Sequence, residues 1–539
     1  MTYRVILRVM LAATVGVATS AAAQSSQPAT ITATHGVYPN LVGNTDRPLR
    51  YRPNGADFVI ENGQEFFNRP LYGRNTAARV DAGDKPEFTI YLPGRGGNLR
   101  LGVRSPARKS KWLFDAARVI TRYRPGMMLY EIHDPLLGAN GVLNVSVVAL
   151  DATDGLAVRA EAKSIDSGVE LVWAYGGVNG KRGTRDGDIG TERVPISEYF
   201  QLKPEFCQNN QFTIDGRRFT LRSKPAMIVG LMPRGSMVGV ADANQWASFD
   251  ALLASVAPTP PARPVVIGHV VLPANGPLFL ALQRVSESTV ANDDLQTYRD
   301  LTTTRPDEPS ASPAKVSFIP AYDPDDIPRV FAEAERHYAA LRERIAVDTP
   351  DPYINAAVGA LNLASDAVWD DPQQNIMHGA IAWRTRLLGW RGPSMLDALG
   401  WHDRARKYLT YWAAQQNTDP IPAKLPGPDE KANLSRSERA LHSNGDLSRS
   451  HYDMNLVYID TTFRHLLWTG DVELARQLWP VIERHLAWER RLFRREFGPE
   501  KLPLYEAYAD IWASDDIQYS GGGVSYSSAY NCYHNRMAA

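Results

Sequence analysis

The chain has 539 residues, 44% of them apolar and 22% charged, which is typical of globular proteins and excludes a disordered or collagen-like chain. Lys and Arg together number 59, as do Asp and Glu, so the net charge of zero gives no global field for binding a nucleic acid. Cys207 and Cys532 are too few for a disulfide framework or a Cys-rich zinc site. We expect two or three domains, no nucleic acid partner, no metal and no cofactor.

The N-terminus has the order of an export signal. Arg4 and Arg8 precede an apolar stretch at residues 9–17, and three alanines end at Ala23. This order predicts a signal peptide over residues 1–23 and a periplasmic or secreted protein. The alternative is an N-terminal anchor, but the stretch is shorter than the ~20 residues that a span needs. No later segment is long and apolar enough, so we predict no membrane span.

Short alternating apolar runs separated by turn residues extend from about residue 58 to residue 285. Leu143, Val145 and Val147 alternate with polar neighbours, which is the period of two expected of half-buried strands, and residues 99–103 show the same pattern. Asp215-Gly216 lies between two such runs and suits a tight hairpin turn, because both residues tolerate positive φ. We predict an antiparallel β-sandwich over residues 24–300.

Prolines are frequent in residues 301–326, and proline lacks the backbone N–H that helices and β-sheets use for hydrogen bonds. We interpret this segment as a linker. Asp325 and Asp326 are candidate caps for a helix that Pro328 enters in its first turn. Asp323 to Asp326 are also a conceivable calcium site, but capping is the simpler explanation.

Beyond the linker the apolar period becomes helical. Leu474, Leu478, Ile482 and Leu486 keep i, i+4 spacing, which predicts one apolar face over several turns. In addition to the helix that Pro328 enters, helices are predicted at residues 353–369, 394–399, 404–415, 454–468, 472–493 and 527–539.

A weak internal repeat lies in this half. Gly400 is followed by Ala405-Arg406, and Gly470 by Ala475-Arg476 at the same spacing. Each glycine ends an apolar helix before an amphipathic one. The repeat predicts stacked αα-hairpins, and therefore an α/α toroid over residues 327–539.

Most of the 12 tryptophans lie in the helical half, where indole faces could stack on the C–H faces of sugar rings. Trp390 and Trp512 lie in loop-like contexts and are candidates for a cleft. Trp468, Trp479 and Trp488 lie on predicted apolar helix faces, so we assign them to the core.

Three segments combine polar and aromatic residues without clean periodicity, at residues 378–393, 442–453 and 505–523. Such segments in a helical domain are usually loops at one end of it. Glycosidic cleavage commonly uses one protonated carboxyl group in an apolar, aromatic setting and a second carboxylate in a polar one. Glu506, between two tyrosines, is the candidate acid; Asp510, Asp515 and Asp453 are candidates for the base. The alternative is that these are surface or capping carboxylates.

Other polar and aromatic residues in these segments are candidates for substrate binding, since Arg presents a fixed donor fork and indoles stack on sugars. They are His378, Arg384, Trp390, Arg391, His451, Tyr508 and Trp512. A buried structural role for the Arg and His residues is the alternative.

The segment RTRLLGWRG at residues 384–392, with the predicted hairpins and the preceding sandwich, resembles the six-hairpin glycosidase superfamily. NRPLYG at residues 68–73 and QYSGGG at residues 518–523 are similar to phrases in large secreted, poorly characterised members from polysaccharide-degrading bacteria. Rhamnosidase-type members carry acidic residues ahead of Leu-Gly-Trp, where this sequence has Thr385 and Arg386. The family's acid therefore has no counterpart there, and the catalytic pair stays open.

These observations predict a glycoside hydrolase acting on a polysaccharide or oligosaccharide. One alternative is a polysaccharide lyase, for which His451, Tyr452, Arg384 and Asn444 are candidates; another is a non-catalytic carbohydrate-binding homologue. The sugar, the linkage and the oligomeric state are not evident from the sequence.

The helical half is short for a closed six-hairpin toroid, which needs twelve helices and over ~200 residues even when compact. Residues 527–539 have the pattern of a helix without a Gly stop. We therefore expect a partial toroid whose open apolar faces associate, the alternative being a smaller complete helical domain.

Overall fold

The computed structural model describes residues 50–92, 96–178, 200–223, 226–288, 316–380, 384, 386, 388, 392–420, 447, 452–505 and 522–539. Residues 52–539 group into one compact unit. No helix in these ranges is long and apolar enough to cross a membrane.

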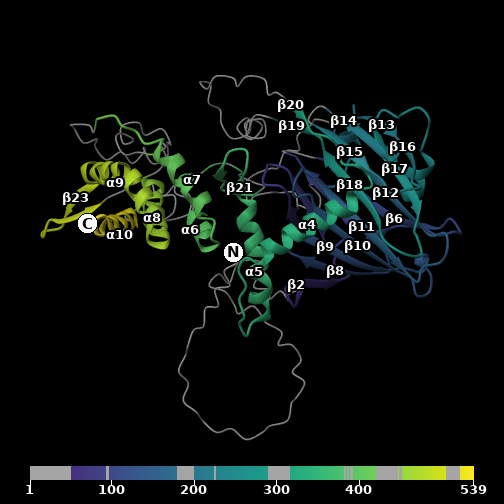
Figure 1. Cartoon of the computed structure of the whole chain (residues 1–539), viewed down its shortest axis with the longest axis horizontal. Coiled ribbons are helices and arrows are strands. Elements are labelled where there is room, and N and C mark those ends of the chain that lie inside the picture. The colour runs from purple at the N-terminus through teal and green to yellow at the C-terminus, as the bar shows by residue number, and fades with distance from the viewer. Residues whose placement is uncertain are drawn as a thin grey trace, which may run out of the picture. The chain divides into compact units, whose positions relative to one another are not determined.

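Two large antiparallel sheets form the N-terminal part (Figure 1). In order across it, the ten-stranded sheet consists of β1 (Arg52–Asn54), β2 (Asp57–Glu61), β8 (Arg118–Arg124), β9 (Met127–His133), β10 (Val142–Ala149), β11 (Gly155–Lys163), β18 (Leu278–Arg284), β15 (Met227–Leu231), β14 (Arg218–Arg222) and β13 (Gln211–Asp215). The eight-stranded sheet consists of β16 (Met237–Asp242), β17 (Pro264–Val271), β12 (Glu170–Gly176), β6 (Asn98–Arg104), β5 (Glu87–Tyr91), β4 (Arg79–Ala82) and β3 (Arg69–Tyr72), with β7 (Ser110–Trp112) beside β6.

The inner faces of the two sheets share one apolar core. Leu99 and Leu101 of β6 and Leu143 and Val145 of β10 are all buried in it. The alternation predicted for β10 is confirmed, since its polar residues are only partly buried. The prediction that β6 is half-buried is wrong, because its outer face is covered as well; Arg100 lies there against aromatic rings.

The hairpin predicted around Asp215-Gly216 joins β13 and β14. Asp215 pairs with Arg218, so the two-residue loop is Gly216 and Arg217, one residue later than predicted. Gly216 has a φ of 55°, a conformation that glycine adopts without a steric penalty.

The predicted helices are confirmed to within a few residues at most ends, and to within five at the start of the last. They are α4 (Ile327–Arg342), α5 (Pro352–Ala367), α6 (Gly392–Ala398), α7 (His402–Ala413), α8 (Tyr452–Thr469), α9 (Val472–Leu492) and α10 (Gly522–Ala538). A short helix that was not predicted, α2 (Phe249–Ala254), packs beside β7 and β16. Three two-stranded antiparallel sheets pair β19 (Ser286–Ser288) with β20 (Val316–Phe318), β21 (Trp369–Asp370) with β22 (Asn375–Ile376), and β23 (Arg494–Phe497) with β24 (Leu502–Tyr505).

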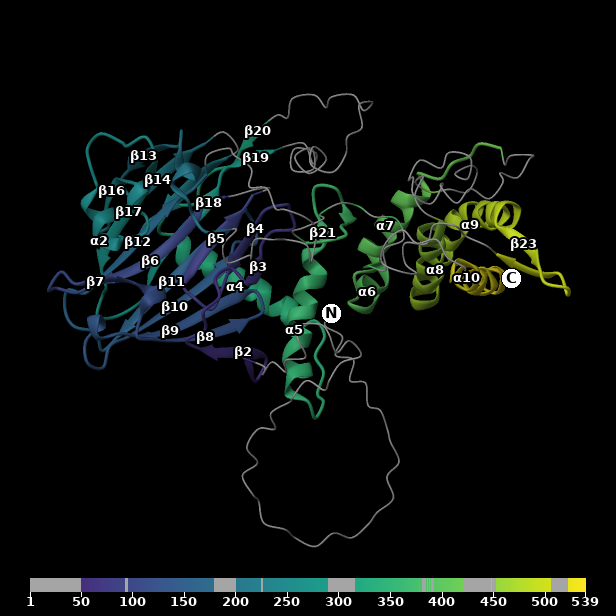
Figure 2. The ribbon, with the colours of Figure 1, turned by 180° about the vertical axis from the view of Figure 1, so that it is seen from behind.

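Helix α4 packs on the ten-stranded sheet and contributes Ile327, Val330 and Tyr338 to the apolar core. Figure 2 shows the eight-stranded sheet from the side opposite this helix. Asp326 occupies the N-cap position, but its side chain makes no capping hydrogen bond. Asp325 instead forms ion pairs with Arg217 at 2.6 Å and Arg234 at 2.8 Å, so the predicted capping role is wrong for both carboxylates.

Helices α6 to α10 are arranged as repeated hairpins. In chain order α6 contacts α8 and α8 contacts α10, whereas α7 contacts α9, so alternate helices form two layers. Gly400 and Gly470 have φ values of 73° and 66° at the turns that end α6 and α8. Arg406 of the first hairpin also forms an ion pair of 2.6 Å with Asp471 at the turn of the next. The two glycine turns therefore match in structure as they do in sequence.

The core assignment of the tryptophans is correct for Trp488, which is fully buried, and wrong for Trp468 and Trp479, which are 63% and 44% exposed. The buried stripe of α9 includes Leu478. Trp479 follows it by one residue, about 100° around the helix axis, and so leaves the buried face.

Candidate functional site

The first of the three polar segments, residues 378–393, directly follows the small β21–β22 hairpin at the end of α5. Met377 donates its N–H to the carbonyl of Val368 at 2.7 Å and forms an isolated bridge with Arg386. The Trp369 indole N–H donates to Asp371 at 2.9 Å. His378, a candidate for substrate binding, is partly buried directly after the bridge. The described residues before and at the start of this segment therefore lie on the C-terminal side of α5.

Arg384 connects the first polar segment to the end of α5 and to β21. Its Nε donates to Asp370 at 3.1 Å, and its terminal nitrogens donate to the carbonyl oxygens of Ala367 and Trp369, each at 2.9 Å. The Arg384 side chain is only 7% exposed and the Asp370 side chain 5%. All three guanidinium nitrogens bind the protein, which favours the structural alternative for Arg384; substrate binding by this residue stays a prediction.

A loop of the sandwich binds the end of α5 from the other side. The Asn75 side chain donates to Asp366 at 3.0 Å, and the Asn75 carbonyl accepts from the N–H of Asp371 at 2.8 Å. Arg79 donates to the carbonyl of Ala367 at 2.9 Å. Burial, and then the nearby charge of Arg384, lowers the pKa of Arg79 to about 9. The loop directly after the NRPLYG phrase, together with Arg79 of β4, therefore contacts the end of α5 and the β21–β22 hairpin.

Guanidinium groups stack on aromatic rings around this segment. Arg404 donates to Asp366 at 2.7 Å and lies 5.2 Å from the ring centroid of Trp369 and 4.8 Å from that of Trp401. Arg344 lies 4.5 Å from the Trp401 centroid. Arg386 lies 4.5 Å from the ring of Tyr411. Such cation–π contacts attract the guanidinium groups to the aromatic rings.

Most of the remaining predicted site residues lie outside the described residues. These are Glu506, Asp510, Asp515, Trp390, Arg391, His451, Tyr508 and Trp512. Asp453 lies in the first turn of α8, and its side chain is outside the description. The described flanks of the acidic segment meet, because the N–H of Tyr505 in β24 donates to the hydroxyl of Ser528 in α10 at 2.9 Å.

The sequence analysis did not find an Asp–His pair between α6 and α8. Both carboxylate oxygens of Asp397 lie 2.9 Å from Nδ1 of His465, and His402 Nδ1 lies 3.0 Å from the same carboxylate. Nε2 of His465 is buried and makes no hydrogen bond within the described part of the chain. Asp397 and His465 each precede one of the repeated glycine turns, and this signal was available in the sequence.

A second group of buried polar residues lies between α9 and α10. His485, Glu489 and His534 are at most 1% exposed. Burial, and then the nearby His485, lowers the pKa of His534 well below its usual value. No group of three or more His, Cys, Asp or Glu side chains is arranged to hold a metal ion among the residues that the structure describes.

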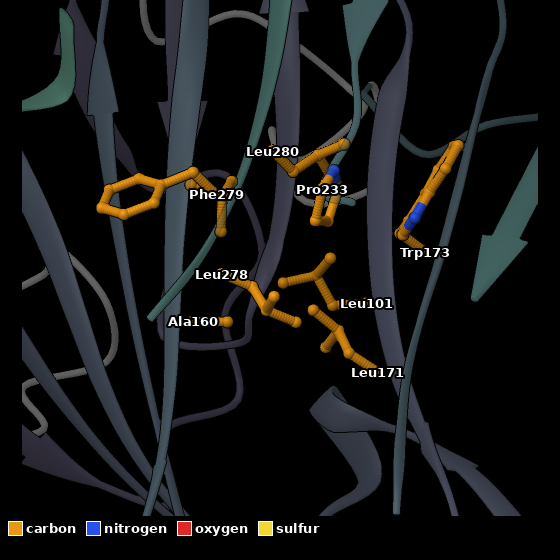
Figure 3. Close-up of a pocket in the computed structure, with 9 residues that line it drawn as sticks. Leu101, Ala160, Leu171, Trp173, Pro233, Leu278, Phe279 and Leu280 are labelled. Atoms are coloured by element: carbon orange, nitrogen blue, oxygen red, sulfur yellow. The ribbon is translucent and has the colours of Figure 1, made fainter. Parts of the chain in front are cut away.

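Figure 3 shows a small pocket between the two sheets, where Leu101, Leu171 and Trp173 of one sheet face Leu278 and Leu280 of the other. Apolar side chains line it throughout. A sugar would find no hydrogen-bond partners for its hydroxyl groups here, so we assign this pocket to imperfect packing of the core.

Comparison with known proteins assigns no established activity. Residues 92–306 match a family described as a domain of unknown function (DUF4450). No curated protein matches the chain. Similar solved structures include a bacterial glucoamylase complexed with acarbose, at 8% identity and a TM-score of 0.43, covering 88% of this chain and 67% of that one. A protein described as a kojibiose phosphorylase from the human microbiome has 8% identity and a TM-score of 0.42, covering 85% of this chain and 62% of that one. The chain spans about two thirds of the length of these structures.

Proposed function

We propose that the chain is an exported glycoside hydrolase that cleaves a polysaccharide or oligosaccharide by carboxylate acid and base catalysis. The observation that carries the proposal is the composition of residues 505–516, where four carboxylates alternate with tyrosines and a tryptophan. An aromatic setting raises the pKa of a carboxyl group, and aromatic faces also bind sugar rings.

The architecture supports this proposal. Antiparallel sheets are followed by helical hairpins whose alternate members form two layers. We interpret this layering as part of an α/α toroid, the arrangement that the resemblance to six-hairpin glycosidases implies. Tyr505, the last described residue before the rest of the acidic segment, lies beside α10.

Glu506 would protonate the leaving oxygen, and Asp510, Asp515 or Asp453 would activate water or attack the sugar. Replacing Glu506 by Gln keeps the shape of the side chain and removes the proton donor. We expect Glu506→Gln to lower turnover ~10² to 10⁴-fold with little change in stability. Glu500→Gln, in the exposed turn between β23 and β24, is the matched control and should retain full activity.

The test is incubation with pectic, hemicellulosic and host-type glycans. Release of reducing sugar without an ultraviolet-absorbing unsaturated product supports hydrolysis. An unsaturated product would indicate the lyase alternative, and binding without turnover would indicate the non-catalytic one. A Glu506→Gln variant with near-wild-type turnover on a substrate with a poor leaving group would exclude Glu506 as the acid.

A further inference from the structure

Two arginine side chains contact the same tryptophan ring, where α4 ends and α7 begins. The guanidinium carbons of Arg344 and Arg404 lie 4.5 Å and 4.8 Å from the ring centroid of Trp401. Arg344 is exposed, whereas Trp401 and Arg404 are partly buried. Both guanidinium groups therefore contact the same ring, and Arg344 is accessible from solvent.

The charges in this stack are not balanced. Arg404 is paired with Asp366, which also accepts from Asn75. Arg344 donates through Nε to the carbonyl of Leu399, and no carboxylate among the described residues forms an ion pair with it. Burial lowers the pKa of Arg344, and the nearby charge of Arg404 lowers it further. The charge of Asp366 raises the pKa of Arg344, but by less than Arg404 lowers it. A bound anion would offset this repulsion.

Two further cations beside or on α7 also lack acidic partners among the described residues. Lys407 donates to the side-chain oxygen of Gln374 at 2.5 Å, and Arg386 lies on Tyr411. Neither forms an ion pair with a carboxylate in the described ranges. Glu343 and Asp403, which neighbour the stack in sequence, are exposed and make no described ion pair with it. Lys407 of α7 and Arg386 of the first polar segment are thus two further cations without a described ion pair.

We propose that Arg344 and Arg404, held by Trp401, bind the carboxylate of a uronic acid residue, so that the substrate is an acidic glycan. The planar fork of Arg matches the two oxygens of a carboxylate, and charge-assisted bonds of this kind are strong and directional. The inference rests on the proposed function, because it names the substrate class of that enzyme. It assigns binding only, and leaves the bond-breaking carboxylates where they were proposed.

The experiment measures binding of galacturonic acid oligosaccharides to the mature chain by calorimetry. The carboxyl-reduced oligosaccharide and a sulfated neutral oligosaccharide are the comparison ligands. We expect the acidic oligosaccharide to bind with an affinity that falls with salt, and the reduced one to bind at least about tenfold more weakly. Arg344→Gln should remove most of this preference, and Arg344→Lys, which keeps the charge without the fork, should remove part of it.

Arg336→Gln is the matched control, because Arg336 is exposed on α4 and forms no ion pair among the described residues. Equal affinity for the acidic and reduced ligands, a preference confined to the sulfated ligand, or an equal loss in Arg336→Gln would each overturn the inference. Uronate binding that depends on Arg344, without cleavage of any glycan, would support the inference and contradict hydrolysis. Cleavage of neutral glycans without uronate binding would support hydrolysis and contradict the inference.

Discussion

The sandwich and the helical part place their charges differently. In the sandwich the space between the sheets is mainly apolar, and the buried ion pair of Arg100 and Glu87, at 2.9 Å, lies on an outer face. In the helical part, charged and titratable side chains such as Asp397, His465 and His534 lie between the packed helices. The stability of the sandwich therefore depends mainly on how well its apolar side chains fit together. The stability of the helical part depends on specific polar contacts and should respond more to changes of charge and pH.

The largest effect should follow the loss of the buried charge at Arg384. Arg384→Met leaves the carboxylate of Asp370 buried without its cation, and removing one partner of a buried ion pair costs about 3–5 kcal/mol. Urea unfolding followed by tryptophan fluorescence measures the loss.

The control for this variant is Arg386→Met. Arg386 is two residues away and partly buried, and stacks on Tyr411 without a described ion pair. Its replacement should cost about 1 kcal/mol or less. Equal losses in the two variants would show that the helical part does not depend on the Arg384–Asp370 pair.

Gly230 in β15 tests the dependence of the sandwich on shape. A Cβ atom at this position would lie 1.9 Å from the ring of Phe219, which is itself fully buried and stacked against Trp173. Gly230→Ala should therefore destabilise the sandwich by about 1–3 kcal/mol, and the loss should be independent of pH. An unchanged free energy of unfolding would mean that the sheets tolerate a shift of this ring.

The helical part should lose stability in mild acid through His534. Its folded-state pKa is lowered, so the unfolded chain binds the proton more readily. The stability contributed by neutral His534 is present above about pH 6.5 and should be lost as the pH falls below it, by at most ~1.4 kcal/mol per pH unit. Unfolding in urea between pH 7.5 and 5.5 measures the slope.

His534→Gln should flatten this slope, whereas His337→Gln, at an exposed position on α4, should leave it unchanged. The same slope in wild type and His534→Gln would show that the pH dependence arises from groups other than His534.

Local sequence patterns predicted the helices and turns better than they predicted which side chains contact one another. The i, i+4 leucines of α9 and the glycine turns at Gly400 and Gly470 gave helices and hairpins, because neighbours in sequence determine both. Trp479 was misplaced because one residue along a helix changes its face.

The partners of site residues depend on contacts between distant segments. Asp397 binds His465 across two helices, and Asn75 of the sandwich binds Asp366. Composition alone does not predict such pairs. Glu506 stays a prediction, since it lies outside the described residues.

The smallest effect should have the opposite sign, at Gly359 in the middle of α5. A Cβ atom here would meet its nearest neighbour, Pro125, at 3.6 Å, which is ordinary van der Waals contact. Glycine inside a helix costs roughly 0.5–1 kcal/mol relative to alanine, because it loses more backbone entropy on folding. Gly359→Ala should therefore raise the free energy of unfolding by about that amount. Paired with Gly230→Ala, it sharpens the contrast, since the same added methyl group should destabilise the sandwich and stabilise α5. Loss of stability in both variants would mean that α5, where it faces Pro125 of the sandwich, is packed as tightly as the sheets.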